Sequence, residues 1–176
     1  MTRRVLLVMD DCGAGDALRL GFCVRAVREA LPDARLTLVV GEEAAAVYRQ
    51  SPLADRLIVS RLYGRAHAGR MSKLLELAKL VLAAGRGHDL VIVLWWGSAM
   101  LRLLAWLTGT GRRVGFGGRF GRLLSSRLGE YDFEGDEVSQ NRLLLADAGI
   151  PGADVAVPTI TSLVGGMYWG ASLGVS

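Results

Sequence analysis

The sequence is poor in cysteine and histidine, with two of each among its 176 residues. Neither Cys12 nor Cys23 stands at ligand spacing from another cysteine or from a histidine. The pattern predicts neither a zinc site nor a disulfide framework. It favours the reducing environment of the cytoplasm as the location of the protein.

Long apolar runs are also missing. Residues 5–9 are the only apolar run before two aspartates near the N-terminus, which predicts that no signal peptide is present. The most apolar window, residues 90–107, is interrupted by Gly97 and Arg102. It is therefore typical of a buried strand followed by a helix and not of a membrane span.

Lysine occurs only at positions 73 and 79, so arginine carries most of the excess of 21 basic over 17 acidic residues. Arginine favours planar, bidentate contacts with phosphate and carboxylate groups. Two interpretations of the net charge of +4 stay open: a solvated, arginine-rich surface, or a surface for an anionic ligand.

Arginines also cluster between positions 112 and 127, but no RNA-binding strand or recognition-helix motif accompanies them, so we expect no nucleic acid partner.

Apolar runs alternate with amphipathic segments along a chain whose length and 51% hydrophobic content suit one folded domain. We expect strands at residues 5–9, 36–40, 56–59, 89–94 and 113–116, and helices from 16 to about 30, at 42–50, 71–84, 98–107 and 136–148. Residues 60–72 read as a basic loop and residues 118–128 as a basic turn or short helix. The alternation predicts an α/β fold with a Rossmann-like, doubly wound and mostly parallel sheet.

The turn after the first strand is the most informative local feature. Gly13 and Gly15 match two positions of a dinucleotide-binding loop, but Leu18 stands where the third glycine belongs. A phosphate-binding P-loop is excluded as well, because no Gly-Lys-Ser or Gly-Lys-Thr follows. What remains is the pair Gly15-Asp16 at the start of a helix.

Asp16 has two interpretations. A carboxylate at a helix start is a good N-cap, and a carboxylate at the end of a first parallel strand is also well placed to act as a general base. Asp10 and Asp11 lie in the same loop, so the three carboxylates together could hold a divalent cation. No further set of ligands follows along the chain, and we predict no metal site.

Several segments, taken in order, resemble the N-terminal half of glycosyltransferase family 9, whose best-known members are the heptosyltransferases of lipopolysaccharide core assembly. The matching segments are residues 5–8 with 15–18, 25–37, 51–58, 89–92, 113–116, 141–145 and 148–151. The resemblance implies one half of a GT-B architecture, with residues 1–157 as the acceptor-side domain and residues 158–176 as an irregular tail. It implies an enzyme that transfers a sugar from a nucleotide-sugar donor to a saccharide or glycolipid acceptor with inversion, and that needs no other cofactor.

The resemblance assigns roles to particular residues. Asp16 takes the position of the catalytic base, and the basic loop supplies acceptor-binding candidates, namely Arg61, Arg65, Arg70 and Lys73. The chain departs from the family after the fourth strand, where Trp95-Trp96-Gly97 replaces part of a common Asp-x-Gln-Gly motif. The tryptophan pair can stack on a sugar face or pack in a core.

The resemblance covers only the first domain, and the sequence has no counterpart of the family's donor-binding domain after Pro158. We therefore expect the chain by itself to be poorly active or inactive, whether it is a truncated product, a single domain or half of a split enzyme, unless a separate donor-binding domain is its partner. The resemblance also implies peripheral contact with the inner face of the cytoplasmic membrane. The alternative is a non-catalytic binding or assembly module for an anionic glycolipid or a protein. In that case Trp95, Trp96, Tyr168 and Trp169 would be contact residues.

Overall fold

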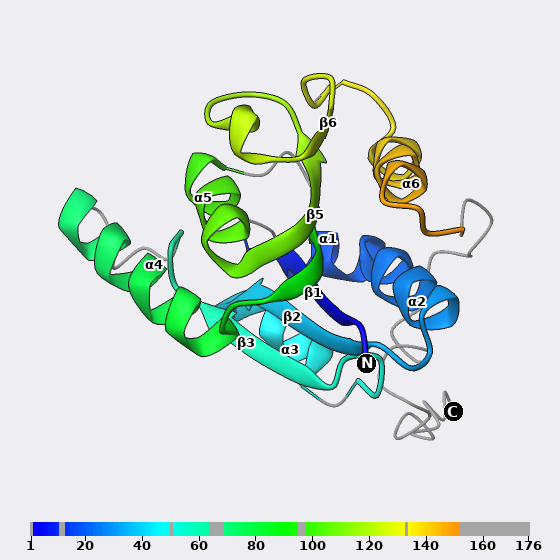
Figure 1. The fold of residues 1–176 in the computed structure, drawn as a ribbon, viewed down its shortest axis with the longest axis horizontal. Coiled ribbons are helices and arrows are strands. Elements are labelled where there is room, and N and C mark those ends of the chain that lie inside the picture. The colour runs from blue at the N-terminus through cyan, green and yellow to red at the C-terminus, as the bar shows by residue number, and fades with distance from the viewer. Residues whose placement is uncertain are drawn as a thin grey trace, which may run out of the picture.

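The computed structural model describes residues 2–10, 13–49, 51–63, 69–94, 98–132 and 134–151. The described strands form one six-stranded sheet in the order β3-β2-β1-β4-β5-β6, and every neighbouring pair is parallel (Figure 1). The strands are β1 (Arg4–Met9), β2 (Arg35–Gly41), β3 (Arg56–Ser60), β4 (His88–Val93), β5 (Gly109–Phe116) and β6 (Ser126–Leu128). This is the strand order of a doubly wound Rossmann-like sheet, so the fold predicted from the sequence is confirmed.

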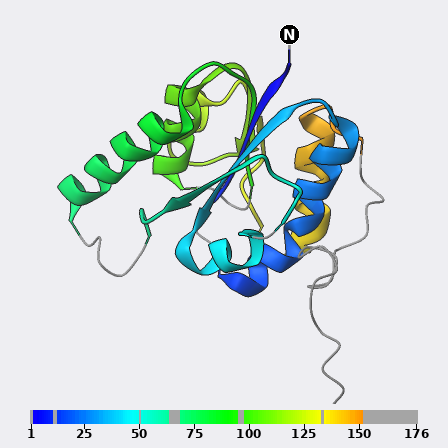
Figure 2. The ribbon, with the colours of Figure 1, turned by 90° about the horizontal axis from the view of Figure 1, so that it is seen from below.

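Helices cover both faces of the sheet (Figure 2). They are α1 (Ala14–Arg19), α2 (Gly21–Ala30), α3 (Glu42–Tyr48), α4 (Arg70–Ala84), α5 (Ala99–Thr108) and α6 (Glu137–Asp147), with a short 3-10 helix η1 (Gly121–Leu123). One core packs under α1, α2, α3 and α6, and the other packs under α4 and α5.

The two cores explain why the central strands are continuous apolar runs. In β1, Val5 and Leu7 point into the first core, whereas Leu6 and Val8 point into the second, and all four are fully buried. Alternate side chains of a strand face opposite sides of the sheet, so a strand covered on both sides needs apolar residues at every position.

The first predicted helix is in fact two helices. The chain turns at Leu20, which joins α1 to α2 with its side chain fully buried, and Gly21 follows at the start of α2. Glycine is a weak helix former, so the helical hydrogen-bond ladder is easily interrupted at this point. Asp16 is also not an N-cap: Gly13 occupies that position, and Asp16 stands in the first turn with its Oδ2 atom 3.3 Å from the Gly13 N–H.

The fifth strand, β5, begins at Gly109 and not at the predicted residue 113, because the glycines at its start are typical of a loop in sequence. A Cβ atom on Gly111 would lie 2.1 Å from the Asp89 carbonyl oxygen, and one on Gly109 would lie 2.8 Å from Val91. Residues 109–112 therefore join the sheet because their glycines allow close approach to β4. Residues 118–128, predicted as a basic turn or short helix, form the short 3-10 helix η1 and then the edge strand β6, which was not predicted.

Two helix starts agree with the sequence. Ser98 caps α5 and accepts a hydrogen bond from the Leu101 N–H, and Asp136 caps α6 and accepts from the N–H groups of Val138 and Ser139. Such caps satisfy backbone donors that have no partner within the helix. The predicted domain boundary at residue 157 and the tail beyond it lie outside the described residues.

Candidate functional site

The candidate site lies at the carboxyl edge of the sheet, between β1 and β4. From β1 the chain builds β2 and β3 on one side, and then returns to place β4 on the other side. The loops after β1 and β4 therefore diverge, and open α/β sheets bind ligands in the crevice that this divergence creates. The sequence-predicted residues of the first turn belong to this edge.

Asp10, the first residue after β1, is a buried structural residue. Its Oδ2 atom accepts a hydrogen bond of 2.6 Å from the hydroxyl of Ser60, at the end of β3. Its backbone also lies against β2, since a Cβ atom on Gly41 would come within 2.6 Å of the Asp10 carbonyl oxygen. Asp10 thus ties the ends of three strands together. Asp11, its predicted neighbour in the site, lies outside the described residues.

Asp16 is a partly exposed carboxylate of this edge. Its side chain is 28% exposed, its Oδ2 atom faces the Gly13 N–H, and its Oδ1 atom pairs with the guanidinium of Arg19. The same Arg19 nitrogen lies 3.2 Å from Oε2 of Glu137, the first residue of α6. One exposed arginine is therefore shared between a carboxylate from α1 and a carboxylate from α6.

Glu137 is the more buried of the two carboxylates, with a side chain only 11% exposed. Its Oε1 atom is buried and makes no hydrogen bond within the described part of the chain. Burial raises the pKa of Glu137, Arg19 opposes that rise, and the charges of Asp16 and Asp136 add to it. Burial likewise raises the pKa of Tyr131, with Glu137 contributing, and the Tyr131 ring packs edge-on against Phe116 at 5.1 Å.

Few described atoms lie close to the two glycines that precede Asp16. A Cβ atom built on Gly15 meets no described atom within 4 Å, and one on Gly13 has only side-chain carboxylate oxygens of Glu43 and Asp16 within that distance. Neither glycine has positive φ. These two predicted site residues are therefore required by neither packing nor backbone strain, and they leave room next to the carboxylate.

The four predicted acceptor-binding residues differ in their surroundings. Arg61 follows β3, and its Nε atom lies 2.7 Å from Glu42 Oε1 in an exposed ion pair. Arg70 opens α4 at the surface, and the Nζ atom of Lys73 lies 5.2 Å from the centre of the Tyr63 ring. Arg65 lies outside the described residues.

Tyr63 brings this basic segment to the end of β4, since its hydroxyl hydrogen-bonds the Ser98 Oγ atom at the start of α5. The segment after β3 and the start of α5 therefore meet at the same edge of the sheet as β1. Three further predicted site residues, Trp95, Trp96 and Gly97, lie outside the described residues.

Sequence analysis did not identify Arg102 as a residue of this edge. Arg102 is buried in α5 and donates hydrogen bonds to the carbonyl oxygens of Phe116, Gly117 and Arg119, which order the chain after β5. Burial lowers its pKa. The only local signal was an arginine within an otherwise apolar helix.

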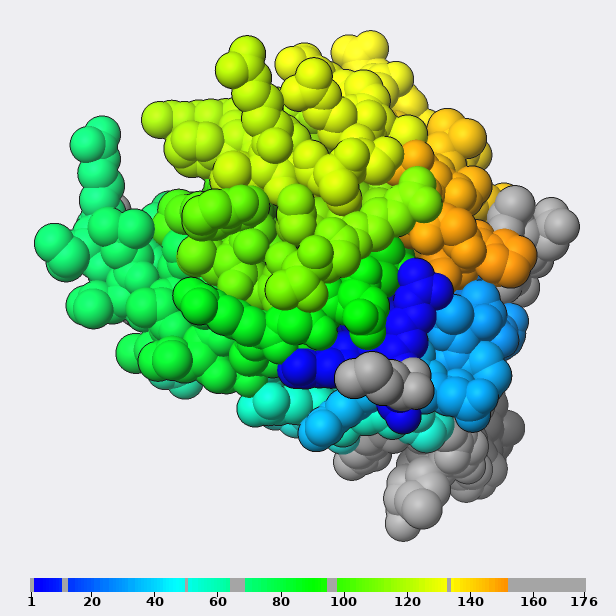
Figure 3. Space-filling view, in the orientation of Figure 1, coloured from blue at the N-terminus to red at the C-terminus, as the bar shows by residue number. Residues whose placement is uncertain are grey.

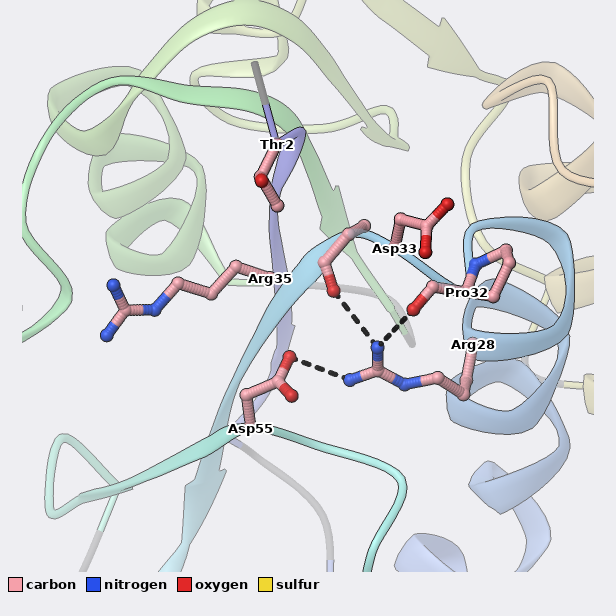
Figure 4. Close-up of a pocket in the computed structure, with 7 residues that line it drawn as sticks. Thr2, Arg28, Pro32, Asp33, Arg35 and Asp55 are labelled. Carbon is pink, nitrogen blue, oxygen red and sulfur yellow. Dashed lines mark hydrogen bonds and ion pairs between the residues drawn. The ribbon is translucent and has the colours of Figure 1, made fainter.

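A separate cavity of about 320 Å³ lies at the opposite, amino edge of the sheet (Figure 4). Its lining residues are Thr2, Arg28, Pro32, Asp33, Ala34, Arg35 and Asp55. Arg28 donates to the carbonyl oxygens of Leu53, Pro32 and Ala34, and it pairs with Asp55 at 2.7 Å. All three guanidinium nitrogens of Arg28 donate hydrogen bonds within the protein, to the loop before β2 and to the loop before β3. Arg28 therefore joins these two loops and is not free to hold a ligand.

Among the residues that the structure describes, no three His, Cys, Asp or Glu side chains are grouped so that they could bind a metal ion. Within the same ranges, no helix has the length and apolar character needed to cross a membrane.

Comparisons with known proteins identify fold neighbours only. No family model matches the sequence, and no curated protein matches it either. The structure is similar to a family 9 glycosyltransferase from Veillonella parvula, with a TM-score of 0.66 and 20% identity over 88% of this chain and 44% of that chain.

It is also similar to the Escherichia coli heptosyltransferase WaaC with ADP-2-deoxy-2-fluoro heptose, with a TM-score of 0.68 and 20% identity over 90% of this chain and 52% of that chain. WaaC with ADP gives a TM-score of 0.60 and 19% identity over 89% and 49% of the two chains. The chain thus spans about half the length of these structures. The resemblance to family 9 glycosyltransferases that the sequence indicated is therefore confirmed at the level of the fold, which is the Rossmann-like fold of these GT-B enzymes.

Proposed function

We propose that this protein is the acceptor-side domain of an inverting glycosyltransferase, with Asp16 as its catalytic base. The donor is a nucleotide sugar and the acceptor is a saccharide or glycolipid. The proposal also assigns Arg61, Arg70 and Lys73, together with Arg65 of the same segment, to binding an anionic acceptor.

The observation that carries the proposal is the place of Asp16. It is a partly exposed carboxylate at the carboxyl edge of the sheet, where the loops after β1 and β4 diverge. The same fold is found in a heptosyltransferase solved with an analogue of a nucleotide sugar. Asp10 is buried and bonded to Ser60, so it is a poor candidate for the same role.

The chemistry needs one base. As the acceptor oxygen attacks the anomeric carbon, its proton passes to Asp16, the new carbon–oxygen bond forms, and the bond to the nucleotide phosphate breaks with its electron pair leaving on the phosphate. Attack from the side opposite the leaving group inverts the anomeric carbon. Arg19 holds Asp16 in place before substrate binds, and Glu137 gives Arg19 a second partner when Asp16 turns toward the acceptor.

Such a reaction needs donor and acceptor held together, because correct placement of the two reactants supplies much of the rate enhancement. The chain spans about half the length of its fold neighbours. We therefore propose that a donor-binding domain, in the same or another polypeptide, completes the active site.

The test is sugar transfer from a panel of nucleotide sugars to phosphorylated lipooligosaccharide, with the donor-binding domain supplied. The variant Asp16→Asn keeps the size of the side chain but removes the base, so kcat should fall by about 100-fold or more. Asp33→Asn is the matched control, because Asp33 is an exposed aspartate at the amino edge of the sheet.

Full activity of Asp16→Asn would exclude Asp16 as the base. Salt-sensitive acceptor binding without turnover, even with the donor domain present, would instead support the alternative of a non-catalytic binding module.

A further inference from the structure

Helix α4 has an exposed apolar side that the fold does not use. Met71, Leu74, Leu75 and Leu82 are 70%, 51%, 59% and 83% exposed, and we call these four residues the α4 outer face. At 100° per residue they fall within one stripe along the helix. The opposite side of α4 already packs on the sheet through Leu77, Leu80 and Ala84. The outer face is therefore additional to what folding requires.

The charges around the α4 outer face have one sign. Helical spacing places Arg70 along one border of the stripe and Lys79 along the other. The only acidic residue of α4, Glu76, is buried, and it accepts from the Arg61 backbone N–H while lying 3.6 Å from Lys79. The surface of the helix thus presents apolar side chains bordered by cations.

The helix is also accessible. In Figures 1 and 2, α4 extends away from the rest of the molecule, and in Figure 3 it forms a projecting end of the space-filling surface. Its first turn lies at the carboxyl edge of the sheet, where Lys73 contacts the Tyr63 ring and Tyr63 reaches Ser98.

We propose that the α4 outer face docks on an anionic lipid bilayer, with its leucines and methionine in the headgroup boundary and Arg70 and Lys79 on the lipid phosphates. An exposed apolar stripe with basic borders has the chemistry of an interfacial helix. Anionic headgroups attract each nearby cation. A second copy of the chain is a poorer occupant, because pairing two such faces would bring cations together without exposed acidic residues on α4 to neutralise them.

Binding through the α4 outer face would orient the carboxyl edge of the sheet relative to the bilayer, and what this means for the acceptor rests on the proposed function. The first turn of α4 and the end of β3 lie at the carboxyl edge of the sheet, where Ser60 binds Asp10 in the segment that precedes Asp16. A glycolipid held in the bilayer would therefore meet the domain along the side from which its acceptor sugar can enter the site.

The test is co-sedimentation of the full chain with vesicles of phosphatidylcholine, with or without phosphatidylglycerol. We expect binding to the anionic vesicles that weakens as salt is added. The double variant Leu75→Gln, Leu82→Gln should weaken this binding by about tenfold or more, since it removes the two most exposed leucines of the stripe. The double variant Arg70→Gln, Lys79→Gln should weaken binding to anionic vesicles only.

Leu143→Gln is the matched control. Leu143 is a leucine of α6 that is 63% exposed and lies on the other side of the sheet, so its replacement should leave vesicle binding unchanged. Equal binding to neutral and anionic vesicles would overturn the proposal. So would unchanged binding of the Leu75→Gln, Leu82→Gln variant, or a wild-type dimer that this variant dissociates in analytical ultracentrifugation.

The assay contains no donor and no acceptor. Loss of vesicle binding would leave the catalytic proposal for Asp16 intact, and failure of the Asp16 proposal would leave the lipid-binding surface intact.

Discussion

An arginine joins neighbouring segments at each edge of the sheet, Arg28 at the amino edge and Arg19 at the carboxyl edge, but the two arginines bind different kinds of groups. At the amino edge, Arg28 meets three carbonyl oxygens and Asp55, and its side chain is 21% exposed. At the carboxyl edge, Arg19 is 55% exposed, and its ion pairs within the described residues are with the carboxylates of Asp16 and Glu137. The first arrangement fixes the chain, whereas the second leaves charged groups that can exchange partners.

The two arginines therefore differ in what they contribute to stability. A partly buried guanidinium that binds backbone carbonyls is strongly stabilising, because losing it leaves several acceptors without partners. An exposed guanidinium between carboxylates contributes little to stability and is free to respond to a ligand.

The largest expected effect is on Arg28. The variant Arg28→Ala removes the bonds to Leu53, Pro32, Ala34 and Asp55, and it should lower the free energy of unfolding by about 2–4 kcal/mol. Chemical denaturation measures this loss. Arg35→Ala, which changes an exposed arginine lining the same cavity, should cost about 0.5 kcal/mol or less. Equal losses in both variants would remove the distinction between a bonded and a solvated arginine.

The next largest effect is the contribution of Asp55 to stability, which depends on pH. Burial acts to raise the pKa of Asp55, but the hydrogen bonds from Arg28 and from the Leu36 N–H outweigh burial and hold that pKa below 3.8. A carboxyl group with a lowered folded-state pKa contributes stability above its unfolded pKa, and that contribution is lost as the pH falls through the folded value. Asp55→Asn should therefore be less stable than wild type at neutral pH, and the difference should shrink toward about pH 3. A difference that stays constant over this range would contradict the assigned network.

Glu137 should show the opposite dependence on pH. Its folded-state pKa is raised above 4.5, first by burial, so its contribution to stability is complete below 4.5 and is lost as the pH rises through the folded value. Glu137→Gln removes this loss, so the variant should gain stability relative to wild type between about pH 4 and pH 7. Thermal unfolding at both pH values measures the change, and a gain that is larger at the acidic end would refute the burial of an ionised Glu137.

The smallest expected effect is on Arg19. Because this arginine is 55% exposed, Arg19→Ala should change the free energy of unfolding by about 0.5 kcal/mol or less. The measurement is the same denaturation experiment used for Arg28. A loss as large as that of Arg28→Ala would show that the carboxyl-edge cluster is a structural joint and would weaken its assignment to the site.

The sequence predicted the elements better than their boundaries. The apolar runs of β1, β2 and β4 were evident because strands buried on both faces have few polar positions. The start of β5 was missed because Gly109 and Gly111 resemble a loop in sequence, although they serve close packing against β4. The break at Leu20 was missed because one apolar periodicity runs through both α1 and α2.

The candidate site was predicted only in part. Asp16 was identified from its turn, and Arg19 stands three residues later on the same helix, at a spacing that a sequence can indicate. Glu137 and Ser60 could not be identified, since they reach Arg19 and Asp10 from elements far away along the chain.

The sequence alone was enough to predict the first five strands and the helices between them, the turn that carries Asp16 and the excess of arginine, because periodicity and turn chemistry are local properties of a chain. Only the tertiary structure decided which charges meet, which carboxylate is buried and which is accessible, and that α4 keeps an apolar side outside the core. These properties depend on how elements pack across the sheet, where each neighbour is supplied by another part of the chain.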